Sequence, residues 1–218
     1  MSWSEMQPLL WQATLETFQM VGWSALFTVL AGLPLGLALV LTDKGGLLAN
    51  QAANKVLGTV VNVGRSLPFI ILLIAITPFT RGVVGTTIGV DAAIVPLAVG
   101  AAPFFARLVE AAVREVDRGL IEAAQAMGAG NLATVRKVLL PESLPALVSG
   151  LTTTVVALVG YSAMAGAVGG GGLGDLAVRY GYQRFENGLM IATVVLLVVL
   201  VQIVQWLGDF GAKRLAHR

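Results

Sequence analysis

Long uncharged apolar runs dominate the chain, and short polar segments separate them. A helix rises about 1.5 Å per residue, so about 20 apolar residues cross a hydrocarbon core about 30 Å thick. The pattern therefore predicts an all-α integral membrane protein with about five transmembrane helices in a single domain. The expected spans are residues 18–42, 57–79, 88–108, 146–168 and 188–207.

The longest charged stretch lies between the third and fourth expected spans and predicts a short helical hairpin. Asp117 is a suitable N-cap for its first helix. Gly128 and Gly130 are expected to stop that helix, because glycine adopts the left-handed conformation without a Cβ clash. A second helix is expected to be capped by Asn131 and to end at Pro141.

The spacing of residues within this hairpin resembles the cytoplasmic coupling loop of bacterial ABC importer permeases. That family carries Glu-Ala-Ala, three residues, Gly, nine residues, Ile, one residue and Leu-Pro, and this chain departs from it only at Val138. In that family the first short helix docks on a separate ATPase subunit. The resemblance implies a coupling loop over residues 117–141 whose coupling residues are Glu122, Ala123, Ala124, Met127, Gly128, Leu140 and Pro141.

Four further stretches resemble the permeases of methionine ABC importers in particular: residues 65–72, 78–81, 102–104 and 160–164. The resemblance implies a homodimer that assembles with two cytoplasmic ABC ATPase subunits and receives substrate from a periplasmic binding protein. It also implies a location in the bacterial inner membrane, in contact with lipid, and inward transport of an amino acid. Methionine is the first expectation for that amino acid, and another small amino acid is the alternative.

The distribution of cationic residues predicts how the chain is oriented in the membrane. If the N-terminus lies outside, the inner segments carry 11 of the 14 Lys and Arg residues, leaving Arg81, Arg179 and Arg184 outside. Arg65 is counted as inner because its long side chain is expected to reach the cytoplasmic interface, one or two turns from the loop before the second span. The alternative is a buried arginine, which would be a candidate for a functional site. The positive-inside rule thus predicts a periplasmic N-terminus, a cytoplasmic C-terminus and a cytoplasmic hairpin.

The sequence lacks the residues that catalysis, metal binding and nucleotide binding usually require. The chain has no cysteine, its one histidine is His217, and no P-loop sequence occurs, so we expect no catalytic residue, metal site or cofactor. The energy for transport would then come from a partner subunit. Gly169, Gly171 and Gly174 match a dinucleotide-binding pattern, but a membrane span precedes them, so we interpret them as a flexible external loop. A net charge of +2 gives no reason to expect nucleic acid binding.

The fourth expected span contains the candidate pathway residues Tyr161, Ser162 and Met164. Small, hydroxyl and flexible apolar side chains can close a pore and still let an apolar solute slide past. Ordinary packing between membrane helices is the alternative interpretation. A secondary transporter is the rival function, but such proteins place ionisable groups near the midplane and show repeated halves. The third alternative, a membrane scaffold, would not need the spacing of the coupling loop.

Overall fold

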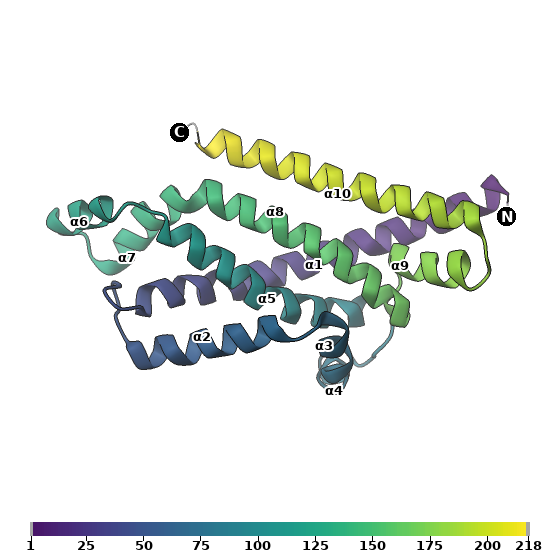
Figure 1. Ribbon diagram of the computed structural model, residues 1–218, viewed down its shortest axis with the longest axis horizontal. Helices are drawn as coiled ribbons and strands as arrows, with labels where there is room; N and C mark the ends of the chain where they lie inside the picture. The colour runs from purple at the N-terminus through teal and green to yellow at the C-terminus, as the bar shows by residue number, and fades with distance from the viewer. Residues whose placement is uncertain (1, 217–218) are drawn as a thin grey trace.

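The structure is a computed structural model that describes residues 2–216, and these residues form helices joined by short turns (Figure 1). No strand occurs among them. The α-helices are α1 (Trp3–Thr42), α2 (Gln51–Ser66), α3 (Phe69–Ala75), α4 (Thr77–Val84), α5 (Val90–Arg114), α6 (Arg118–Ala126), α7 (Asn131–Thr134), α8 (Leu140–Ala165), α9 (Gly172–Leu176) and α10 (Asn187–Ala216). Three π-helical turns adjoin α8 and α9: η1 (Val135–Leu139), η2 (Gly166–Gly170) and η3 (Ala177–Tyr182).

The long helices lie side by side along the longest axis of the molecule, so the molecule has two distinct ends (Figure 1). Four helical segments are long and apolar enough to cross a membrane, and the bent pair of α2 and α3 raises the number to five. This agrees with the expected all-α membrane architecture. The hairpin of α6 and α7 lies at the same end as the C-terminus, whereas the chain starts at the opposite end.

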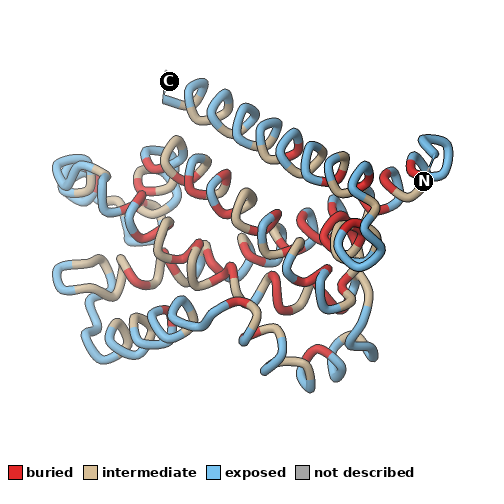
Figure 2. The backbone as a smooth tube through the Cα atoms, turned by 45° about the vertical axis from the view of Figure 1, so that its right-hand side comes forward, coloured by how far each residue is buried: buried red, intermediate tan, exposed pale blue. Residues whose placement is uncertain are grey.

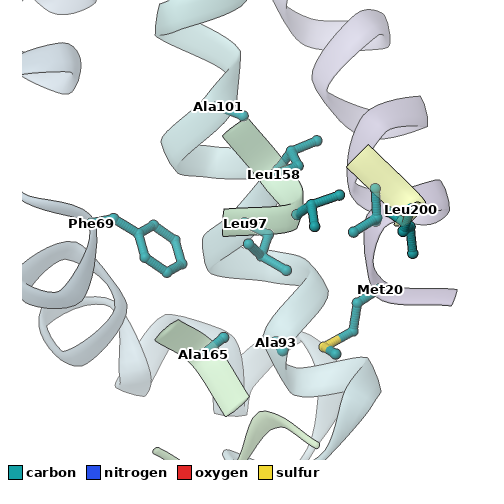
Figure 3. Close-up of a cluster of buried hydrophobic side chains, with 10 residues drawn as sticks. Met20, Phe69, Ala93, Leu97, Ala101, Leu158, Ala165 and Leu200 are labelled. Carbon is teal, nitrogen blue, oxygen red and sulfur yellow. The ribbon is translucent and has the colours of Figure 1, made fainter. Parts of the chain in front are cut away.

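The apolar core lies where α1, α5, α8 and α10 meet. Met20, Leu97 and Leu158 are completely buried there, with Phe69 and Leu200 packed beside them (Figure 3). The outer sides of the bundle are apolar but exposed, most of all along α10 (Figure 2). A helix in a membrane needs no polar outer face, because lipid chains cover that face.

Helices α1 and α5 pack closely because glycine removes the side chains between them. A Cβ on Gly36 would lie 2.5 Å from both the carbonyl oxygen of Ala106 and the Cβ of Val109. A Cβ on Gly32 would lie 2.9 Å from the carbonyl oxygen of Ala102. Membrane helices associate through such small residues, since lipid offers no hydrophobic drive toward association.

The second expected span, residues 57–79, is broken in the structure. Helix α2 stops at Ser66, α3 starts at Phe69, and the two axes differ by 103°. Pro68 explains the break, because proline disfavours helical geometry in the preceding residue and Leu67 is extended, with φ −80° and ψ 124°.

The position of Arg65 differs from the expectation. Helix α2 begins at Gln51, so Arg65 lies in its last turn, about 20 Å along the helix from its start. The expected place, one or two turns from the loop before α2, is wrong. The reason is that the helix starts earlier than the apolar run alone suggested.

Several other helices extend beyond the expected spans. Helix α1 already begins at Trp3, because Met6, Leu10 and Ala13 continue its buried face against α9 and α10. Helix α5 continues to Arg114, where ion pairs accommodate its charged last turns. Amphipathic residues thus prolong these helices past the uncharged cores.

A valine at Gly36 should destabilise the fold, whereas the same residue at Gly22 should not. Both glycines lie in α1, but a Cβ on Gly22 has no neighbour within 4 Å. Overpacking at a close helix contact costs about 1–3 kcal/mol, so Gly36→Val should lower the unfolding temperature of the purified protein in detergent. Equal unfolding temperatures for Gly36→Val and Gly22→Val would contradict the account of this contact.

Candidate functional site

The first helix of the hairpin begins and ends as the sequence predicts. Asp117 Oδ1 accepts a hydrogen bond from the backbone N–H of Gly119 at 2.6 Å, which confirms the N-cap. Gly128 has φ +84°, and its N–H donates to the carbonyl of Gln125, while the N–H of Ala129 donates to that of Ala124. This pair of bonds is a Schellman motif, which requires a left-handed residue after the C-cap.

The start of the second helix differs from the expectation in two ways. Gly130 is extended, with φ −72° and ψ 164°, so it does not take the left-handed conformation expected for it. Asn131 is the first residue of α7 rather than its cap, and its side-chain amide donates to the carbonyl of Leu47 at 3.1 Å. The asparagine therefore ties the hairpin to the loop between α1 and α2, a contact that no local pattern indicates.

The expected helix end at Pro141 is also wrong. Pro141 lies in the first turn of α8, and the helical segment that starts at Asn131 runs past it without interruption as far as the kink at Val168 and Gly169. The π-turn Val135–Leu139 immediately before α8 explains the difference. A wider turn changes the hydrogen-bond register, so the missing N–H of a proline can be tolerated there. The hairpin and the fourth membrane helix are thus one element.

The coupling residues are divided between an outer and an inner face of the hairpin. Ala124 is buried against the body of the protein, with Ile121 half-buried beside it. Glu122 and Ala123 are exposed, and Met127 is 83% exposed at the tip of the hairpin. The remaining coupling residues lie at the base of α8, with Leu140 half-buried and Pro141 exposed.

An ion-pair cluster that sequence reasoning missed lies behind the hairpin. Arg114 contacts Asp43 at 2.7 Å and Glu110 at 2.9 Å, joining the end of α5 to the end of α1. Hydrogen bonds from the Arg114 side chain and from the backbone N–H of Lys44 hold the pKa of Asp43 below its ordinary value. These ion pairs therefore hold the end of α5 in place, and α6 follows only a few residues later.

Arg107 adds α2 to the same cluster. It pairs with Glu110 and donates to the side-chain oxygen of Asn62 at 2.8 Å and to the carbonyl of Gly58 at 3.3 Å. Arg107, Glu110 and Arg114 recur at helical spacing, so their mutual contact could have been read from the sequence. The link from Arg107 to α2 could not, because it joins residues far apart in the chain.

A cavity of about 530 Å³ separates part of the hairpin from the loop between α1 and α2. Charged residues from both sides line it, including Asp43, Lys44, Arg118 and Glu122. The cavity therefore lies between the loop and the side of α6 that carries Glu122, while Ile121 packs on the core cluster of α5 and η1.

The three candidate pathway residues do not share one environment. The Tyr161 ring stacks on that of Phe69, with centroids 4.7 Å apart and planes inclined by 9°. Ser162 is buried, and its hydroxyl donates to the carbonyl of Val159 within the same helix at 2.8 Å. Met164 is 39% exposed. Tyr161 and Met164 are spaced to lie on one helix face, whereas Ser162 is buried.

The glycine-rich segment after α8 packs against α1, so the expectation that it is a flexible loop is wrong. The N–H of Gly172 donates to Glu16 Oε2 at 2.8 Å, and that of Leu173 donates to Thr17 Oγ1 at 2.9 Å. A Cβ on Gly172 would lie 2.7 Å from the Thr17 hydroxyl. The glycines thus allow this segment to approach α1, and sequence reasoning missed its contacts with Glu16 and Thr17.

Comparison with known proteins gives a consistent assignment. Residues 32–217 match the model of the family described as "Binding-protein-dependent transport system inner membrane component". The chain is 55% identical over 210 residues to a probable D-methionine transport system permease protein MetI of Vibrio cholerae, covering 96% of this chain and 93% of the relative. It is 50% identical over 200 residues to the methionine import system permease protein MetP of Bacillus subtilis, covering 92% and 90%.

The fold agrees with these relatives. A chain in a solved inward-facing structure of the MetNI methionine ABC transporter superposes with a TM-score of 0.96 at 50% identity, and 99% of each chain is covered. Together with the helical hairpin, the broken second span and the family match, this assigns the chain. It belongs to the family of inner-membrane components of binding-protein-dependent transport systems, the multi-pass permease subunits of ABC importers.

Proposed function

We propose that this permease imports methionine, with ATP hydrolysis supplied by a separate subunit. The observation that carries the substrate is the similarity to methionine permeases over nearly the whole chain, at 55% and 50% identity. The proposed assembly is a homodimer of this chain with two cytoplasmic ATPase subunits, fed by a periplasmic binding protein. Ten spans, five from each copy, would then surround a pathway on the twofold axis.

The proposed mechanism uses the hairpin as the link to the ATPase. Helix α6 presents the exposed Glu122, Ala123 and Met127 to a cleft on the ATPase subunit, and the turn at Gly128 sets the angle of approach. The helical segment from Asn131 to Gly170 then continues into the membrane. Met164 lies about 50 Å along that segment from Asn131, so a tilt of the hairpin would reach the pathway through one continuous helix.

The proposed orientation places the hairpin and the C-terminus in the cytoplasm and the N-terminus in the periplasm. The two ends of the fold are compatible with it, since the hairpin and the C-terminus lie together and the N-terminus lies opposite (Figure 1). If Arg65, in the last turn of α2, is not counted as inner, the inner segments still carry 10 of the 14 cationic residues. The positive-inside preference is thereby retained.

Reconstitution of the complex in liposomes tests the proposed function. We expect ATP-dependent uptake of L- or D-methionine when the ATPase and the binding protein are present, and no ATP hydrolysis by this chain by itself. Uptake without ATP would favour a secondary transporter. ATP-dependent uptake of a different amino acid, with none of methionine, would correct the substrate and leave the importer assignment intact.

Gly128→Val should weaken attachment of the ATPase without preventing membrane insertion. Gly128 has φ +84°, a conformation that costs a residue with Cβ about 1–2 kcal/mol and a β-branched residue more. Gly130→Val is the matched control, because its backbone is extended and no atom lies within 4 Å of an added Cβ. Pull-down of the ATPase, with uptake measured in the same cells, compares them. Wild-type values for Gly128→Val in both assays would remove the coupling role from this turn.

Met164→Ala should alter transport while leaving the complex assembled. Met164 is partly exposed next to the stacked Tyr161, whereas Ser162 is buried, so Ser162→Leu should disturb packing and gating together. The measurements are methionine uptake and ATP hydrolysis in the absence of substrate. Thr153→Ala, at an exposed position of the same helix, should match the wild type. If Met164→Ala and Ser162→Leu change neither quantity, the pathway role is lost.

A further inference from the structure

Arg65 is an exposed cation with no partner in the part of the chain that the structure describes, and the proposed orientation places it well inside the membrane. It lies in the last turn of α2, about 20 Å along the helix from Gln51. No hydrogen bond or ion pair engages it among residues 2–216, in contrast to Arg107 and Arg114 of the neighbouring α5. An unpaired arginine at such depth is costly, and such residues mark substrate or ion pathways.

Arg65 lines a groove of about 140 Å³ where α2, α3, α5 and α8 meet. The groove combines one cation with an aromatic wall and two glycines; its lining includes Arg65, Phe69, Phe104, Tyr161, Gly64 and Gly100. Figure 3 shows Phe69 beside the buried core at the start of α3. The groove therefore joins the broken second span to the helix that carries the candidate pathway residues.

The helices around the groove are held in place by close contacts at its two glycines. A Cβ on Gly64 would lie 2.7 Å from Cγ of Pro103, and a Cβ on Gly100 would lie 3.1 Å from Cδ2 of Leu72. These contacts fix α2 and α3 on α5 independently of Arg65. The Arg65 side chain is thus free to bind a ligand without being needed for packing.

We propose that Arg65 binds the carboxylate of the amino acid in transit, with the side chain of that amino acid against Phe69 and Tyr161. A guanidinium binds a carboxylate through two parallel hydrogen bonds, and a thioether makes favourable contacts with aromatic rings. The stacked pair, 4.7 Å between centroids, offers such rings on α3 and α8. This inference rests on the proposed function, because it names the contact that a methionine importer would make inside the membrane.

The test compares Arg65→Gln, Arg65→Lys and the control Arg81→Gln in the reconstituted complex. Arg81 is an exposed cation on α4 that does not line the groove. Methionine uptake and ATP hydrolysis stimulated by the binding protein are measured in the same liposomes. Losing a charge-assisted hydrogen bond predicts uptake reduced about tenfold or more in Arg65→Gln, with ATP hydrolysis retained. Arg65→Lys should fall between Arg65→Gln and the wild type, and Arg81→Gln should match the wild type.

Three results would overturn the assignment. Uptake by Arg65→Gln at the wild-type rate would remove the contact. If Arg65→Lys also loses both uptake and ATP hydrolysis, Arg65 has a structural role. Arg65→Lys decides this point even where Arg65→Gln does not assemble. If uptake by the wild type depends on phosphatidylglycerol in the vesicles and uptake by Arg65→Gln does not, the ligand of Arg65 is a lipid phosphate.

Failure of the proposed function is distinguishable from failure of this inference. If the wild-type complex imports another amino acid in place of methionine, the substrate assignment fails and the same variants are compared with that amino acid. That amino acid also has a carboxylate for Arg65 to bind. Its uptake by the Arg65 variants therefore still shows whether Arg65 binds the carboxylate.

Discussion

Backbone hydrogen bonding inside the membrane is the constraint on which this structure depends. Lipid offers no partner for a free N–H or C=O, so non-helical backbone is tolerated at that depth only where protein covers it or a cavity receives it. The chain leaves helical geometry at Leu67 and Pro68, beside the groove of Arg65, and again near Gly171, where Glu16 and Thr17 accept the next N–H groups. The candidate pathway lies between these two breaks, which is where the fold can offer polar groups to a solute.

The same constraint explains how the hairpin can reach the pathway. Because the helical segment is continuous from Asn131 to the kink at Val168 and Gly169, its internal hydrogen bonds can transmit a tilt of the hairpin as far as Met164. Glycine packing holds α1 against α5, and the Arg114 cluster fixes the end of α5 from which the hairpin departs. One side of the hairpin is thus anchored, and the other continues as α8 into the membrane.

Features of this fold that depend on neighbouring residues could be predicted from the sequence, whereas features that depend on long-range contacts could not. The apolar spans, the Asp117 cap and the left-handed Gly128 depend on residues near one another in sequence, so they were predictable. The helical continuation through Pro141 depends on a π-turn whose register sequence spacing does not reveal. The Arg107 contact with Asn62 and the burial of the glycine-rich segment depend on partners far away in the chain. For the candidate site, the motif indicated which residues belong to the hairpin but not which of them face outward.

Thiol labelling at Met127 shows whether the hairpin tip is the surface that meets the ATPase. The chain has no cysteine, so Met127→Cys creates a single reactive position in it, at a residue that is 83% exposed. Tyr182→Cys is the control; the residue is 71% exposed and belongs to η3, in the link between α9 and α10 at the end opposite the hairpin (Figure 1). A hydrophilic thiol reagent should modify both positions in the chain alone, and the ATPase should protect only Met127→Cys. Equal labelling of Met127→Cys with and without the bound ATPase would contradict the account.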